Sequence, residues 1–135
     1  MNIKFSSREL VLEAQDANDA KQAREFLDLY LRRLATEDSD FYSASLAFGE
    51  LIANVVRHAP GSIHVRLDWS ASQPVLSVRD HGPGFAFRSA LPEDPLAEGG
   101  RGLFIVASLV RDLAVEKMPE NGTVVRATLP VTRRA

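Results

Sequence analysis

Glu50-Leu51-Ile52-Ala53-Asn54 stands inside a segment with a clear helical pattern. Apolar residues recur there at steps of three and four positions, as on a helix with one face against a core. The members of this stripe are Phe48, Leu51, Ile52, Val55, Val56 and Ala59. Glu50, Asn54 and His58 follow at steps of four along its edge. With an N-cap offered by residues 38–40, the segment therefore predicts a helix that ends near His58, with a carboxylate and a carboxamide one turn apart.

This pair of polar side chains suits a site for a metal ion and a phosphate. Mg²⁺ prefers oxygen ligands and keeps several waters, so the carbonyl of Asn54 suffices when phosphates supply further ligands. Glu50 can orient an attacking hydroxyl group or accept its proton. The same spacing is also typical of the solvated edge of an ordinary helix. Taken alone, this segment leaves both interpretations open.

A second polar segment, Asp80-His81-Gly82-Pro83-Gly84, follows a strand predicted over residues 74–80. In an apolar pocket the carboxylate of Asp80 can accept a hydrogen bond from an exocyclic amine such as that of adenine. Asp-x-Gly-x-Gly is also good turn chemistry in its own right. The proline-bearing stretch over residues 85–99 is longer than a hairpin turn requires. We therefore predict that residues 85–99 form a lid, mobile without a ligand.

The third segment, Gly99-Gly100-Arg101-Gly102, precedes a helix predicted over residues 101–113. A glycine loop at a helix N-terminus presents unpaired N–H groups, which bind phosphate well. Arg101 can add charge-assisted hydrogen bonds to a terminal phosphate or to a partner's carboxylate. The alternative is a hinge without a ligand. Neither a P-loop nor a dinucleotide-binding glycine fingerprint occurs in the chain.

The remaining pattern alternates between strands and helices. Residues 2–13 are expected to form one or two strands around Ser6-Ser7, and residues 16–35 a helix. A further strand is expected at 63–67, and residues 115–118 and 123–129 are expected to pair as a hairpin.

The 135 residues predict a single domain, 1–135, and a net charge of −2 gives no general attraction for nucleic acid. The chain has no cysteine and no apolar run of roughly 20 residues. We expect a cytoplasmic protein without a membrane segment.

Taken in order, these segments resemble the nucleotide-binding boxes of the GHKL superfamily, the Bergerat-fold ATPases that include histidine kinases and gyrase-type ATPases. Within it, the chain looks most like the bacterial anti-sigma-factor serine kinases. Their N-box appears as Glu50 to Ala59, with Asn54 and His58 in place. Their D-x-G-x-G box appears as Asp80 to Gly84, the glycine box as residues 100–103, and the N-G-T box as residues 121–123.

The resemblance implies a role for each matching residue. Asn54 would hold Mg²⁺, and Glu50 would be the base or the orienting group for the acceptor serine. Asp80 would bind the adenine amine, supported by Thr123. Gly82 and Gly84 would act as hinges of the lid. The phosphates would contact Gly100, Gly102 and the amide of Leu103. Arg101 would lie near the γ-phosphate.

The resemblance also implies the fold and the activity. The fold is an α/β sandwich in which three helices cover one face of a mixed, mostly antiparallel sheet. The activity is ATP-dependent phosphorylation of a serine on a STAS-domain anti-anti-sigma protein, coupled to binding of a sigma factor. The resemblance is compatible with a homodimer and leaves the oligomeric state open. Three other functions are also open: a partner-binding module controlled by ATP, a serine kinase of a STAS scaffold without a sigma factor, and the catalytic domain of a histidine kinase.

Overall fold

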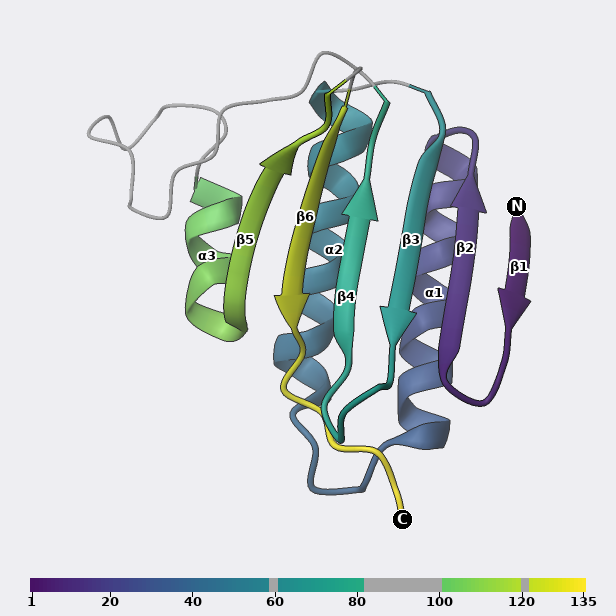
Figure 1. Cartoon of the computed structure of the whole chain (residues 1–135), viewed down its shortest axis with the longest axis vertical. Helices are drawn as coiled ribbons and strands as arrows, with labels where there is room; N and C mark the ends of the chain where they lie inside the picture. The colour runs from purple at the N-terminus through teal and green to yellow at the C-terminus, as the bar shows by residue number, and fades with distance from the viewer. Residues whose placement is uncertain (59–60, 82–100, 120–121) are drawn as a thin grey trace.

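The protein is a two-layer sandwich of one β-sheet and three helices (Figure 1). The structure, a computed structural model, describes residues 1–58, 61–81, 101–119 and 122–135, without the side chains of residues 57, 58 and 101–104. The helices are α1 (Ala17–Leu34), α2 (Phe41–His58) and α3 (Arg101–Leu109). The strands are β1 (Asn2–Phe5), β2 (Glu9–Ala14), β3 (Ile63–Asp68), β4 (Val75–Arg79), β5 (Arg111–Lys117) and β6 (Thr123–Thr128).

The sheet has the strand order β1-β2-β3-β4-β6-β5, and all five pairings between these strands are antiparallel. All three helices lie behind the same face of the sheet in the view of Figure 1. This confirms the predicted sandwich with three helices on one face. No parallel pair occurs among the described strands, so the mixed character that we expected is absent from them.

Aspartates begin the two long helices. Asp16 accepts a hydrogen bond from the backbone N–H of Asp19 at 2.8 Å and so caps α1. Asp40 accepts one from the backbone N–H of Ser43 at 3.0 Å, at the start of α2. The hydroxyl and the N–H of Ser43 both stabilise the carboxylate, which lowers the pKa of Asp40. The caps confirm the helix starts predicted near Asp16 and within residues 38–40.

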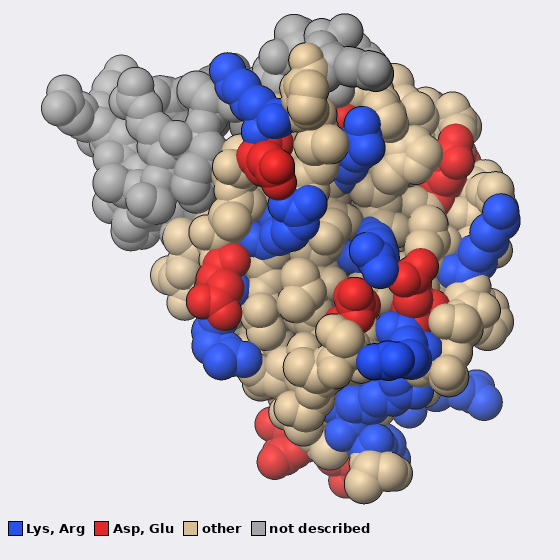
Figure 2. All heavy atoms as spheres, viewed as in Figure 1, with Lys and Arg blue, Asp and Glu red and all other residues tan. Residues whose placement is uncertain are grey.

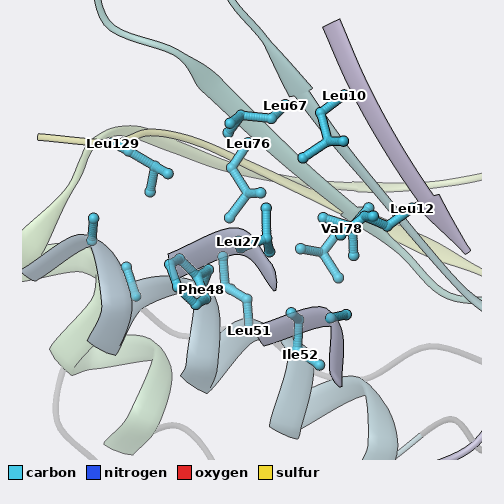
Figure 3. Close-up of a cluster of buried hydrophobic side chains, with 14 of the residues drawn as sticks. Leu10, Leu12, Leu27, Phe48, Leu51, Ile52, Leu67, Leu76, Val78 and Leu129 are labelled. Carbon is cyan, nitrogen blue, oxygen red and sulfur yellow. The ribbon is translucent and has the colours of Figure 1, made fainter. Parts of the chain in front are cut away.

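The core lies between the sheet and the helices (Figure 3). Strands β2, β3 and β4 bury alternate residues, because successive side chains point to opposite faces of a sheet. The stripe of α2 predicted from the sequence supplies Phe48, Leu51, Ile52 and Val55, all of them buried. Burial of this apolar area holds α2 against the sheet, with its polar edge next to the stripe.

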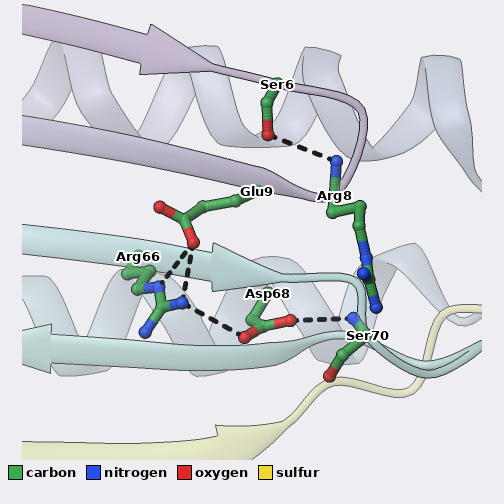
Figure 4. A network of polar contacts seen from close by, with 6 residues as sticks. All are labelled: Ser6, Arg8, Glu9, Arg66, Asp68 and Ser70. Carbon is green, nitrogen blue, oxygen red and sulfur yellow. Dashed lines mark hydrogen bonds and ion pairs between the residues drawn. The ribbon is translucent and has the colours of Figure 1, made fainter.

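The opposite face of the sheet is charged, with acidic and basic side chains interspersed (Figure 2). Arg66 of β3 contacts Glu9 at 2.7 Å and Asp68 at 3.4 Å (Figure 4). The backbone N–H of Ser70 is the main cause of the lowered pKa of Asp68. Exposed ion pairs of this kind each contribute about 0–1 kcal/mol. They keep this face of the sheet polar but add little to stability.

One helix boundary predicted from the sequence is wrong. The helix expected over residues 101–113 ends at Leu109, and β5 begins at Arg111, which pairs with Thr128 of β6. Asp112 has a φ of 55°, which no α-helix accommodates. Leu113 and Val115 then alternate toward the core as strand residues. The apolar residues after Leu109 are therefore buried by the sheet rather than by a longer helix.

Among the described helices, none combines the length and the apolar character needed to span a membrane.

Candidate functional site

Three elements bring their ends together at one end of the sheet. The C-terminal turn of α2, the end of β4 and the start of β6 all lie at the top of Figure 1. β4 and β6 are neighbours in the sheet, with Arg79 paired to Val124. Asn54 lies in the last part of α2, Asp80 follows β4 directly, and Thr123 begins β6. The residues predicted to bind the metal and the adenine therefore belong to the same end of the molecule.

Asp80 and Thr123 are neighbours below the surface. The backbone N–H of Asp80 donates a hydrogen bond to the carbonyl oxygen of Thr123 at 3.1 Å. Asp80 is 0% exposed and Thr123 is 1% exposed. Burying a carboxylate in a protein is unfavourable unless polar groups surround it. A buried Asp and Thr at the end of two central strands are therefore typical of a binding site rather than of a structural core.

Several side-chain atoms at this end are buried without a hydrogen-bond partner in the described part of the chain. They include the Oγ1 of Thr123, the Nδ2 of Asn54, a residue that is 8% exposed, and the Nε of Arg79 at the end of β4. Each such atom costs about 1–3 kcal/mol when it is left without a partner. A ligand with polar groups would remove this cost, and the amide of Asn54 can offer either a donor or an acceptor. The site therefore fits a polar ligand such as a nucleotide.

Glu50 lies one turn before Asn54 on α2 and is half-buried. It belongs to the polar edge of the helix, next to the apolar stripe that holds α2 on the sheet. Its side chain is therefore partly exposed to solvent, and its role as a base or an orienting group stays a prediction.

The described residues contain no group of three or more His, Cys, Asp or Glu side chains that could hold a metal ion. Asn54 stays the predicted protein ligand of Mg²⁺, together with oxygen atoms of a phosphate.

Several predicted residues cannot be compared with the structure. Gly82, Gly84, Gly100 and the lid over residues 85–99 lie outside the described residues. Arg101, Gly102 and Leu103 form the first turn of α3, where only the backbone is described. A helix does begin at Arg101, as the glycine box predicted. The phosphate-binding roles of these residues stay predictions.

Gly122, which the sequence places in a turn and in the N-G-T box, also lies in close contact with the candidate site. Its φ is +105°, and a Cβ atom there would clash with the carbonyl oxygen of Asp80. The absence of a side chain thus lets the start of β6 lie directly against Asp80. In the sequence, the Asn121-Gly122 dipeptide indicates a turn, but glycine also marks close approach of two backbones.

Replacing Gly122 is expected to destabilise the protein through this contact. Positive φ alone costs about 1–3 kcal/mol for an alanine. The clash with Asp80 adds about 1–3 kcal/mol. Gly61→Ala is the matched control, because Gly61 has a φ of +134° but no atom within 4 Å of the position that a Cβ atom would take. Urea unfolding of both variants should show the larger loss for Gly122→Ala, and equal losses would mean that the close approach to Asp80 is unimportant.

Comparisons with known proteins agree with this geometry. Residues 12–129 match the family model described as a histidine kinase-like ATPase domain. The histidine kinase domain of the E. coli osmosensor EnvZ is a similar solved structure, with 24% identity, a TM-score of 0.51 and 91% of each chain covered. The catalytic domain of histidine kinase ThkA is another, with 20% identity, a TM-score of 0.52, and coverage of 92% of this chain and 99% of that one. At these identities the two structures support the fold. No curated protein sequence matches the chain.

Proposed function

Because the chain belongs to the family of histidine kinase-like ATPase domains, within the GHKL superfamily, we propose that it is a protein-serine kinase that uses Mg-ATP. Its acceptor would be a serine of a STAS-type anti-anti-sigma protein, and it would also bind a sigma factor. Family membership supports an ATP-dependent kinase domain. The choice of a serine acceptor and of these partners rests on the resemblance of the four boxes to anti-sigma-factor serine kinases.

The observation that carries the proposal is the buried polar end of the sheet. Asn54 and Thr123 both have a buried polar atom without a partner among the described residues, and their elements meet at the same end of the sheet as the buried carboxylate of Asp80. Such atoms are rare in folded proteins and require an explanation. A nucleotide explains all three residues together, because it brings an amine for Asp80 and charged oxygen atoms for the region of Asn54.

Each described residue then has one task. Asp80 accepts a hydrogen bond from the adenine amine, and Thr123 supports it with its hydroxyl group. Asn54 holds Mg²⁺ against the phosphates. Glu50 orients the serine hydroxyl and accepts its proton. Mg-ATP supplies the phosphoryl group and the cation that neutralises charge on it, so the protein mainly positions the reactants.

The half-buried Glu50 favours a kinase over a module that only changes shape on binding ATP. A binding module requires Asn54 and Asp80, but it does not require a carboxylate one turn before the metal ligand. A kinase requires all three residues. The half-buried position of Glu50 on α2 supports this choice, because its side chain is partly exposed to solvent.

A transfer assay tests the proposal. The wild-type protein is incubated with Mg-ATP labelled on the γ-phosphate and with any STAS-type protein encoded beside it. We expect acid-stable label on one serine of the acceptor, and no label when that serine is replaced by alanine. Acid-labile label on a histidine would instead indicate histidine kinase chemistry. If no acceptor is labelled, yet ATP changes the binding of a partner, the binding-module function is correct.

A further inference from the structure

An open hollow of about 670 Å³ lies between the outer face of α1 and the hairpin of β1 and β2. Phe5, Phe26, Leu29, Tyr30 and Leu34 form its apolar wall, and Arg33 and Arg133 also line it. We call it the α1 groove. It lies by the turn between β1 and β2, whereas Asp80 follows β4 at the opposite end of the sheet. The groove is therefore separate from the candidate nucleotide site.

Helix α1 carries two apolar stripes, of which one is fully buried in the sandwich and the other only in part. Ala20, Ala23, Leu27 and Leu31 are buried against the sheet. Phe26, Leu29, Tyr30 and Leu34 form the second stripe, at steps of three and four residues along the groove. Leu29 is 69% exposed. A stripe of this kind usually packs against another helix, because its side chains form a ridge that fits between those of a partner.

Strand β1 is exposed at the same place. Phe5 pairs with Leu10 of β2, so the two side chains share the face that the helices cover. Leu10 is buried, whereas Phe5 is 72% exposed. In Figure 1, β1 lies at the edge of the sheet, beyond α1. The helix layer thus leaves Phe5 and Leu29 exposed at the α1 groove, whereas Phe26, Tyr30 and Leu34 are half-buried and also pack against the core.

The charge of the α1 groove has one sign. No Asp or Glu lines it, and neither Arg33 nor Arg133 forms an ion pair within the described part of the chain. Arg133 is held in place, since it donates a hydrogen bond to the carbonyl oxygen of Ser7 at 2.6 Å and lies 5.5 Å from the centroid of the Trp69 ring. An apolar wall with fixed positive charge is complementary to an apolar segment with acidic neighbours.

We propose that the α1 groove binds an amphipathic helix of a partner protein, with an apolar stripe flanked by Glu or Asp. This helix would lie beside α1 as a fourth helix of the layer and would cover Phe5 and Leu29. The stripe from Phe26 to Leu34 is about 12 Å long at 1.5 Å per residue, which suits a helix of two to three turns. A second copy of the chain fits less well, because a two-fold contact through this groove brings Arg33 and Arg133 of both copies together.

The test uses two synthetic helical peptides with the same leucine stripe, flanked by Glu in one and by Lys in the other. Amide chemical shifts of the ¹⁵N-labelled protein are followed during titration. We expect the Glu peptide to shift amides from Phe26 to Leu34 and at Phe5, and to bind about tenfold more tightly than the Lys peptide. Arg33→Glu should reverse this preference, and Leu29→Asp should abolish binding of both peptides. Lys21→Glu, a charge reversal elsewhere on α1, should change neither affinity.

Both test positions are exposed, so the variants are expected to keep the wild-type melting temperature, which is measured first. Lack of binding by the Glu peptide would overturn the proposal. Equal binding of both peptides, unaffected by Arg33→Glu, would overturn the acidic character of the partner. A concentration-dependent dimer in sedimentation that Leu29→Asp disrupts, without peptide binding, would assign the groove to a second copy. The test does not use ATP, so its outcome is independent of the proposed kinase activity.

Discussion

Asp80→Asn is expected to weaken ATP binding by on the order of 10²-fold, which corresponds to about 2.7 kcal/mol. The buried carboxylate only accepts hydrogen bonds, whereas the new amide presents a donor where the adenine amine requires an acceptor. Because the position is fully buried, water cannot replace the lost interaction. Calorimetric titration of the variant with Mg-ATP measures the effect.

Asp68→Asn is the matched control for this prediction. It makes the same change on the neighbouring strand β3, at the opposite end of the sheet from Asp80. Its carboxylate accepts hydrogen bonds from Ser70 and Arg66, away from the candidate site. ATP affinity should be unchanged in this variant. If Asp80→Asn binds ATP as well as the wild type and Asp68→Asn do, Asp80 does not bind the adenine base.

Glu50→Gln is expected to lower phosphoryl transfer to the acceptor protein by roughly 10²-fold or more, if the carboxylate serves as a general base. Glutamine keeps the size of the side chain and the helix, but it cannot accept the proton of the serine hydroxyl. ATP affinity should change little, because the proposed nucleotide contacts come from Asn54, Asp80 and Thr123. Single-turnover transfer and calorimetric titration, measured on the same sample, separate the two effects.

Glu25→Gln provides the control, since Glu25 is an exposed carboxylate on α1. It should leave both transfer and binding at the level of the wild type. Undiminished transfer by Glu50→Gln would show that the role assigned to Glu50 is wrong. A parallel loss of ATP affinity in Glu50→Gln would place this residue in nucleotide binding instead.

Local pattern predicted most of the fold. The stripe from Phe48 to Val55 predicted the existence and the buried face of α2, and the capping residues at 38–40 predicted its start. Alternation over residues 63–67 and 74–80 located the two central strands. These signals are local, because each depends on side chains that lie within one or two turns of each other.

Features that depend on distant residues were not predictable in the same way. The end of α3 at Leu109 reflects the pairing of Arg111 with Thr128, and the apolar composition of 103–110 gave no sign of it. Gly122 is required by the carbonyl group of Asp80, which is 42 positions earlier in the chain. The exposure of Phe5 and Leu29 at the α1 groove depends on where β1 lies relative to α1, so the sequence pattern did not predict it.

The candidate site was also predictable only in part from the sequence. Motif order predicted Asn54, Asp80 and Thr123, and the structure brings their elements to one end of the sheet. Burial of their side chains came only from the structure, since it depends on how α2, β4 and β6 pack together. Gly82, Gly84, Gly100 and residues 85–99 lie outside the described residues, so the predicted lid and its hinges stay predictions.

Calorimetric titration of the wild-type protein with ATP, ADP and GTP, with and without Mg²⁺, tests the central claim most directly. We predict that ATP and ADP bind, that Mg²⁺ strengthens binding of ATP, and that GTP binds far more weakly because it lacks the adenine amine. Preference for GTP would show that Asp80 does not bind an adenine amine. Failure to bind ATP at millimolar concentration would contradict the account, because the buried polar atoms of Asn54 and Thr123 would then have no nucleotide to explain them.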